Sequence, residues 1–349
     1  MKHFFSYYNL QDGFQIKYTI VVMMVANLLA LIMISPAASQ TKAQIELDGK
    51  RSLEEAFVRI PISTAQQGMW PSVAWDGQNY FVIWAQSDED CNCSKILGAR
   101  VTPAGKVLDS PAIPIATAPI AQYYPSITWG GKNFLVVWFE EHVDTRADIF
   151  GARVSPEGMA LDPTGIPICT LAGHQLYPDV ASNGELFLVV WADDRLCTGC
   201  RDLYGARVNA DGSVLDTDNI PISTTPGVHP EPRVVSDGKD FFVVWEDHGS
   251  DYRRRFGIPV LIPALSKNGE IRGTKVSSQG IVLDPPGIPI SGASPGQSKI
   301  NPHVAWNGEN FLVVWESGGI HGRQLHSDGS IVNPSTIDFQ KLNFTTTIP

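Results

Sequence analysis

The sequence predicts an all-β fold, a β-propeller of about five four-stranded blades, with six blades as the alternative. The first observation is a string of the type Phe-Leu-Val-Val-Trp, which occurs five times in the 349 residues with a period of about 53. The second is a proline that stands 13 residues before the tryptophan of every copy. The tryptophans are Trp84, Trp138, Trp191, Trp245 and Trp315, and the prolines are Pro71, Pro125, Pro178, Pro232 and Pro302.

Each unit divides into four predicted strands. The first follows the proline, as in "PSVAW" and "PSITW", and it ends at a dipeptide such as Asp76-Gly77 or Asn183-Gly184, which tolerates the positive φ of a hairpin turn. The second is the continuously apolar string, which indicates a strand buried on both faces. The third is "GARV" or a variant of it, and the fourth lies in "VLD…IPI".

Units that are apolar on both faces must stack against neighbours, and a radial arrangement protects the strand edges. The five full repeats occupy residues 63–345, with an insertion near 248–270 that lengthens one tryptophan spacing to 70 residues. The segment 41–62, "TKAQIELDGK…RIPI", matches only the third and fourth strands of a unit. We expect this half repeat to dock against the last unit and close the ring.

The pattern resembles tandem repeats of secreted bacterial proteins that read V-A-x-D-G-x-x-F-L-V-V-W, then I-x-G-x-R-V, then L-D and I-P-I. The resemblance covers residues 43–340 and implies a propeller-like extracellular domain. It carries no established activity. The fourth unit departs from the pattern by its insertion, and the fifth by weakened third and fourth strands.

The N-terminus predicts export. Lys17 precedes a long apolar run and then the small-residue stretch "SPAASQ", which is typical of a signal peptide over residues 1–40; an uncleaved membrane anchor is the alternative. The remainder is expected to be secreted or otherwise extracytoplasmic, in the periplasm or at the cell surface, where disulfides are allowed. The net charge of −10 argues against nucleic acid and anionic membranes as partners, because both are polyanions.

Two polar columns repeat and are therefore expected to belong to the scaffold. Carboxylates such as Glu140 and Asp193 follow the tryptophan string, and we interpret them mainly as polar caps of strand ends. A basic residue in the third strand stands nine positions before an acid in the fourth, as in Arg153 and Asp162, and Lys275 and Asp284 occupy the same positions. This spacing predicts a cross-strand ion pair that contributes at most about 1 kcal/mol if it is exposed.

The residues on either side of each strand-start proline vary between units, which is where a repeat protein has room for a function. Before the proline stand aromatic or polar side chains, and after it stand hydrogen-bonding ones. Aromatic faces beside polar groups suit a sugar or peptide ligand, whereas ordinary packing at a strand start is the alternative. The ligand-binding candidates are Trp70, Tyr124, Tyr177, Asp179, Glu231, Arg233 and His303.

The cysteines suggest disulfides rather than metal. Cys91 and Cys93, like Cys197 and Cys200, lie in predicted loops of an exported chain, so local or inter-loop disulfides are favoured over a zinc site, and Cys169 reads as a buried unpaired thiol. No metal or cofactor site is predicted. Acidic loops leave calcium binding open, although no spacing matches an EF-hand.

The string "GASPG" at 292–296 matches the hydrolase motif G-x-S-x-G only by letters. The motif needs the N–H of the residue after the serine, and here that residue is a proline, which has none.

Three functions stay open on these grounds. The leading expectation is a non-catalytic propeller, not an enzyme, that binds a glycan, a peptide or a surface protein through its loop rim. The alternative is a glycoside hydrolase or lyase whose carboxylates lie at the channel mouth, with Asp179, Glu231 and Glu140 as candidates. The third is a structural component of the envelope. The ligand itself cannot be inferred from these residues.

Overall fold

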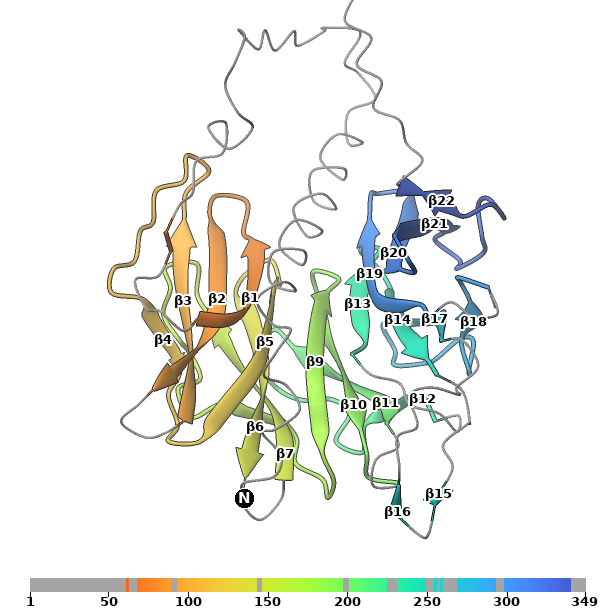
Figure 1. The fold of residues 1–349 in the computed structure, drawn as a ribbon. Helices are drawn as coiled ribbons and strands as arrows, with labels where there is room; N and C mark the ends of the chain where they lie inside the picture. Colours follow the sequence, from red (N-terminus) through yellow and green to blue (C-terminus); the bar gives the residue numbers. More distant parts are fainter. Residues whose placement is uncertain are drawn as a thin grey trace, which may run out of the picture.

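The computed structural model describes residues 61–62, 68–88, 93–142, 146–196, 201–224, 231–248, 254–255, 258–259, 269–292 and 298–339. Within these residues the chain is all-β and contains no α-helix. It forms five four-stranded antiparallel sheets, one for each repeat, which confirms the predicted class and the four strands of each unit (Figure 1).

Every sheet uses its four strands in the order of the sequence. Sheet 1 consists of β1 (Gly68–Trp75), β2 (Tyr80–Asp88), β3 (Cys93–Val101) and β4 (Ile113–Ala116), and sheet 2 of β5 (Ala121–Trp129), β6 (Phe134–His142), β7 (Arg146–Val154) and β8 (Ile166–Cys169). Sheet 3 consists of β9 (Gln175–Ser182), β10 (Leu186–Asp193), β11 (Asp202–Asn209) and β12 (Ile220–Ser223). Sheet 4 consists of β13 (Arg233–Ser236), β14 (Phe241–Asp247), β17 (Glu270–Val276) and β18 (Ile288–Pro289), and sheet 5 of β19 (Ile300–Trp306), β20 (Asn310–Glu316), β21 (Ile320–His326) and β22 (Ile337–Asp338).

The second strand of each sheet supplies side chains to two different cores. In β6, Phe134 and Val136 pack toward sheet 1, whereas Leu135 and Val137 pack toward sheet 3, and all four are fully buried. This alternation is what a strand with period 2 must do when both of its faces are covered. Burying one such side chain stabilises the fold by about 1.5–3 kcal/mol, so the repeated apolar string holds the sheets together.

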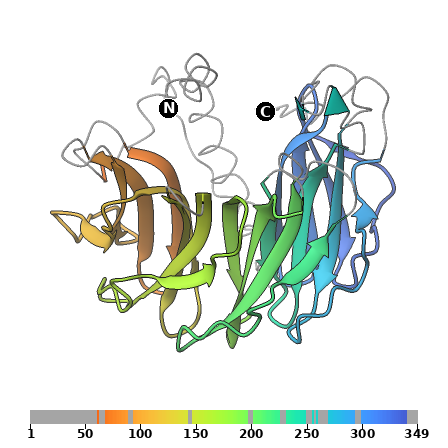
Figure 2. The same ribbon diagram turned by 90° about the horizontal axis from the view of Figure 1, so that it is seen from below.

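Four hydrophobic clusters join sheets 1 and 2, 2 and 3, 3 and 4, and 4 and 5. Figure 2 shows the sheets following one another along an arc, with sheet 1 in orange and sheet 5 in blue at its two ends. The first strands of consecutive sheets contact one another, and they lie on the inner side of the arc. The inner strands therefore bring residues that are far apart in the sequence into one place.

The two segments that depart from the repeat are only partly described. Within the insertion, β15 (Arg254–Arg255) and β16 (Ile258–Pro259) pair as a separate two-stranded sheet and do not extend β14 or β17, as an ordinary lengthening of those strands would require. The half repeat 41–62 and the signal segment 1–40 lie outside the described residues, apart from Pro61 and Ile62. In the part of the chain that is described, no helix is long and apolar enough to cross a bilayer.

Candidate functional site

The residue before each strand-start proline adopts a left-handed backbone in all five sheets. Trp70, Tyr124, Tyr177, Glu231 and Asn301 have φ between 47° and 54°. A bulge follows in β1, β5, β9 and β19, where the pairing register shifts across this position. The sequence did not predict this conformation, because a residue before proline usually adopts an extended backbone. Bulges redirect side chains, and here they turn the side chains of four inner strands at the same point.

Three of these left-handed residues are aromatic, and their rings contact one another from sheet to sheet. Trp70 stacks on Tyr124 with ring centroids 4.4 Å apart, and Tyr124 meets the edge of Tyr177 at 4.7 Å. The ring of Tyr124 also lies parallel to that of Phe139, at 5.8 Å. The ring faces that we expected to be open to a sugar are therefore partly used for packing between sheets, although all three left-handed aromatic side chains remain half-exposed.

The residue after the proline starts a row of polar contacts that crosses the inner strands. The Ser126 hydroxyl in sheet 2 donates to Asp179 Oδ1 in sheet 3 at 2.7 Å, and the Val234 N–H in sheet 4 donates to Asp179 Oδ2 at 2.9 Å. Asp179 thus joins three sheets through one carboxyl group. Asp179 is among the candidates predicted from the sequence and Ser126 is not, because a serine after a proline carries no signal of its own.

Desolvation sets the proton affinity of this carboxyl group. The surrounding protein raises the pKa of Asp179 above its usual value because the carboxylate is poorly hydrated there, although Arg233 and the hydrogen bonds oppose the shift. The Ser126 hydroxyl can donate to the carboxylate or accept from the protonated acid, so both states of Asp179 can be hydrogen-bonded. A partly exposed carboxyl group with a raised pKa is a candidate general acid.

Arg233 connects Asp179 to two further candidates. Its guanidinium lies 3.4 Å from Glu231 Oε2, and these two side chains retain 29% and 38% exposure, so the pair is open to solvent. Burial, assisted by the positive charge of Arg233, lowers the pKa of His303 to about 3, and His303 is therefore neutral at physiological pH. The structure thus gathers Asp179, Glu231, Arg233 and His303 from sheets 3, 4 and 5.

Glu140 has a different environment. Its Oε1 accepts hydrogen bonds from Trp138 Nε1 at 2.9 Å and from Gln122 Nε2 at 3.0 Å, and the residue is 6% exposed. Asp193 accepts from Trp191 Nε1 in the same way, at 3.0 Å. These carboxylates satisfy the indole N–H groups of the repeated tryptophans, which agrees with their interpretation as polar caps and leaves Glu140 little scope as a catalyst.

The predicted cross-strand ion pairs form in sheets 1, 2 and 3. Arg153 Nη2 lies 2.8 Å from Asp162 Oδ1, and the Nε and backbone N–H of Arg153 both donate to Oδ2. Arg100 with Asp109 and Arg207 with Asp216 repeat this geometry. The side chains are about four-fifths buried rather than exposed, so we expect each pair to contribute more than the sequence suggested.

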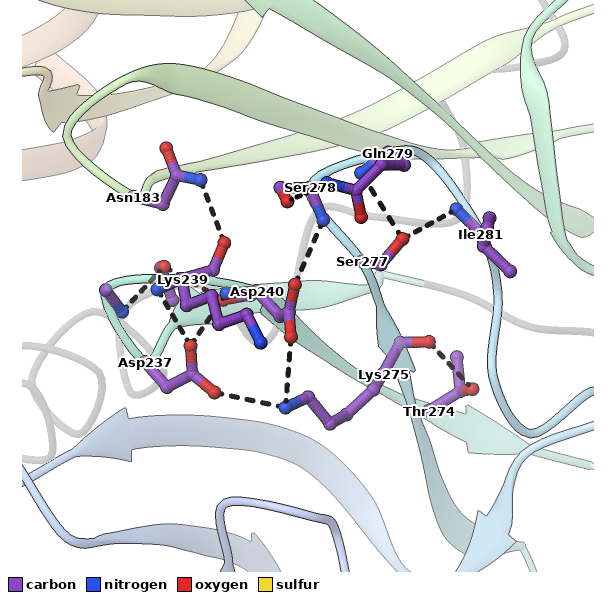
Figure 3. A network of polar contacts seen from close by, with 12 residues as sticks. Asn183, Asp237, Lys239, Asp240, Thr274, Lys275, Ser277, Ser278, Gln279 and Ile281 are labelled. Carbon is purple, nitrogen blue, oxygen red and sulfur yellow. Dashed lines mark hydrogen bonds and ion pairs between the residues drawn. The ribbon is translucent and has the colours of Figure 1, made fainter.

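In sheet 4 the expected pair of Lys275 with Asp284 is wrong. Figure 3 shows Lys275 Nζ directed instead at Asp237 and Asp240, at 3.1 and 3.5 Å, in the turn between the first two strands. An arginine can bind both oxygens of one carboxylate with its planar guanidinium, whereas a lysine has only a single amine. The Lys275 amine therefore binds the acids nearest to it, Asp237 and Asp240. Ser278 N–H donates to Asp240 at 3.1 Å and completes this network.

The cysteine predictions are only partly testable. Cys169 is a buried free thiol, as predicted. Cys93, the first residue of β3, is disulfide-bonded, as predicted. Cys91, Cys197 and Cys200 lie outside the described residues, so the pairing stays a prediction. Among the residues that the structure describes, no group of three or more acidic, histidine or cysteine side chains is arranged to hold a metal ion.

Comparisons with known proteins found fold neighbours but no relatives. No family model and no curated protein matches the chain. A thermostable family-43 glycoside hydrolase is 13% identical, with 79% of this chain and 96% of that one covered and a TM-score of 0.45. A B. subtilis levansucrase mutant is 9% identical, with 82% and 90% covered and a TM-score of 0.47. An endo-arabinase from Bacteroides thetaiotaomicron is 14% identical, with 78% and 99% covered and a TM-score of 0.43.

These solved structures run against the leading expectation from the sequence, a non-catalytic binding protein that is not an enzyme. They are a glycoside hydrolase, a levansucrase and an endo-arabinase, so that expectation is not kept. Similarities of this size identify neither a substrate nor a catalytic residue. The chemistry of the site therefore rests on this chain's own side chains.

Proposed function

We propose that the chain is a glycan-cleaving enzyme, a glycoside hydrolase or lyase, whose reacting groups are Asp179 and Glu231. The observation that supports this most is the contrast between the two carboxyl groups. Asp179 sits among hydrogen-bond donors in a poorly hydrated position that raises its pKa, whereas Glu231 is solvent-exposed beside Arg233. A carboxyl group whose pKa is raised by burial, close to a second carboxyl group that is open to solvent, suits an acid and a base.

In this proposal Asp179 donates its proton to the departing glycosidic oxygen. Glu231, as the carboxylate, either activates a water or attacks the sugar carbon, and the separation of the two carboxyl groups in the complex with substrate selects between these routes. In a lyase the same carboxylate would instead remove a proton from the sugar. Arg233 lies 3.4 Å from Glu231 Oε2 and can hold this carboxyl group in place, and neutral His303 can supply a hydrogen bond without adding a charge.

The substrate would lie along the inner strands. The half-exposed aromatic row of Trp70, Tyr124 and Tyr177 leads away from the carboxyl groups, and its ring edges and remaining faces offer apolar contact to sugar CH groups. We further propose that the five sheets are the blades of a five-bladed propeller, whose inner strands form the mouth. The enzyme would act outside the cytoplasm, as its predicted signal peptide indicates.

The test uses isosteric substitutions. The wild-type protein and the variants Asp179→Asn and Glu231→Gln are incubated with arabinan, levan, xylan and pectin, and cleavage is followed by reducing ends and by the ultraviolet absorbance of unsaturated products. We expect the wild type to cleave at least one polymer, and each variant to lose about 100-fold or more of that rate with its fold intact. The absorbance distinguishes a lyase from a hydrolase.

Glu185→Gln is the matched control, since Glu185 is exposed in the turn between β9 and β10, away from the inner strand starts. It should keep the wild-type rate. A wild type that is inactive on every polymer, or variants of Asp179 and Glu231 that remain fully active, would show the proposal to be wrong.

A further inference from the structure

Sheet 1 has one apolar face that no described part of the chain covers. Tyr80 and Trp75 are each 41% exposed and Val73 is 40% exposed. In sheet 2 the residue equivalent to Tyr80 is Phe134, which is fully buried under sheet 1. Sheet 1 therefore has the apolar face by which a sheet of this repeat packs against the preceding one. In sheets 2 to 5 the corresponding faces are buried in the four apolar clusters between consecutive sheets.

A contact between a glycine and an isoleucine recurs wherever one sheet packs against the preceding one. The turn between the third and fourth strands of each later sheet contains a glycine with positive φ, and this glycine lies against the first isoleucine of the preceding Ile-Pro-Ile. A Cβ on Gly212 would lie 2.9 Å from Ile166 Cδ1, and one on Gly280 would lie 3.1 Å from Ile220 Cδ1. The glycine is thus required to make room for the neighbouring strand.

Sheet 1 carries the same turn. Gly105 has φ of +82°, and its N–H donates to Thr102 O just as Gly158 N–H donates to Ser155 O in sheet 2. A glycine shaped to receive an isoleucine is therefore present on sheet 1, where no Ile-Pro-Ile strand of a preceding sheet is described.

The chain contains one further Ile-Pro-Ile, at residues 60–62, directly before sheet 1. Ile62 precedes Pro71 by 9 positions, while Ile115 precedes Pro125 and Ile168 precedes Pro178 by 10. In the later sheets this short connection leads from the fourth strand of one sheet to the first strand of the next, and the two sheets pack against each other. A connection of nearly equal length restricts residues 60–62 to the corresponding position beside sheet 1.

We propose that residues 43–62 dock on this free face of sheet 1 as a half sheet of two strands, with Ile60 against Gly105 and the apolar side chains over Tyr80. This changes the expectation from the sequence, in which the half repeat docks on the last unit. The fourth strand of sheet 5 is a weaker occupant. Its Ile337 is followed by Asp338 and Phe339 rather than by Pro-Ile, and β22 is only two residues long.

Amide hydrogen exchange on the unmodified protein tests the docking without any substitution. The amides of residue 60 and residues 62–63 should be protected to a similar degree as those of β4 (Ile113–Ala116), since both would be fourth strands of a packed unit. Exchange at the rate of an unstructured chain would overturn the proposal.

Hydroxyl-radical footprinting of Tyr80 then identifies the occupant. Ile60→Asp should increase the labelling of Tyr80 several-fold and lower the melting temperature, because a carboxylate cannot be buried in this contact. The matched control Ile337→Asp should leave the labelling unchanged. If Ile337→Asp exposes Tyr80 and Ile60→Asp does not, sheet 5 covers the face, and the proposal is wrong; it is equally wrong if neither variant changes the labelling. If Ile60→Asp fails to fold, the exchange measurement on the unmodified protein still decides.

Discussion

The pair of Arg153 and Asp162 offers a quantitative test of how the sheets are stabilised. We consider a double-mutant cycle with Arg153→Ala, Asp162→Ala and the double variant. The guanidinium donates from Nε and Nη2 to both carboxylate oxygens at 2.8 Å, and the two side chains are only 20% and 17% exposed. The cycle isolates this pairwise interaction from the contact of the guanidinium with the Gly212 turn of sheet 3.

The geometry sets the expected magnitude. An exposed ion pair contributes up to about 1 kcal/mol, whereas hydrogen bonds to a charged group contribute about 1.5–3 kcal/mol. A bidentate pair that is mostly but not fully removed from water should fall between these limits, so we expect a coupling free energy of about 1–2 kcal/mol at neutral pH. Added salt should reduce it only moderately, because the pair is partly shielded from mobile ions.

The pH dependence has a defined direction. The hydrogen bond from Arg153 holds the pKa of Asp162 below its ordinary value of 3.8. An acid whose pKa is lower in the folded state stabilises the fold above its unfolded pKa, and this stabilisation is lost as the pH falls through the folded pKa. The coupling should therefore be constant from pH 7 down to about pH 5 and should shrink below pH 3.8.

The assay is urea unfolding followed by tryptophan fluorescence, with the free energy of unfolding extracted for all four proteins. The control cycle uses Lys275 and Asp284, which occupy the same positions in sheet 4, although Lys275 binds Asp237 and Asp240 instead. Its coupling should be close to zero. A coupling below about 0.3 kcal/mol for Arg153 and Asp162, or equal couplings in both cycles, would refute the reasoning from geometry.

Three further predictions follow from the same structure. Glu140→Ala should lower the free energy of unfolding by about 2–4 kcal/mol, because it leaves Trp138 Nε1–H and the Gln122 amide without their acceptor. Glu140→Gln keeps an oxygen at this place and should lower the free energy of unfolding less. Chemical unfolding measures both variants, and equal losses would contradict the role of the acceptor. Asp179→Asn should raise the melting temperature at pH 7 but not below pH 3.8. The pKa of Asp179 is higher in the folded than in the unfolded state, so this acid destabilises the native state increasingly as the pH rises above the unfolded value of 3.8. A melting temperature that falls at pH 7 would contradict this. Excision of residues 252–267 with a short Gly-Ser join should leave the melting temperature nearly unchanged. The reason is that β14 and β17 pair over their whole length, from Phe241↔Val276 to Asp247↔Glu270, without contribution from that segment. Calorimetry that shows an unfolded product would prove the segment to be part of the core.

The sequence by itself determined the repeat, its four strands and most of its scaffold. Apolar strings such as Phe134–Trp138 can only be strands buried on both faces, and a cation nine residues before an acid lies beside it across a hairpin. Such features are local or periodic, so one chain is enough to reveal them. The same reasoning failed for Lys275, because the length and shape of a side chain decide which of several nearby acids it reaches.

Only the tertiary structure decided which side chains meet on the inner strands. Ser126, Asp179 and Val234 are separated by more than fifty residues from one another, and their hydrogen bonds exist because consecutive sheets place their first strands side by side. The left-handed backbone before each proline, where Trp70 stacks on Tyr124, occurs at tryptophan, tyrosine, glutamate and asparagine alike, so the residue type does not reveal it. Burial, and with it the raised pKa of Asp179, is a property of the assembled sheets, which no pattern along the chain can express.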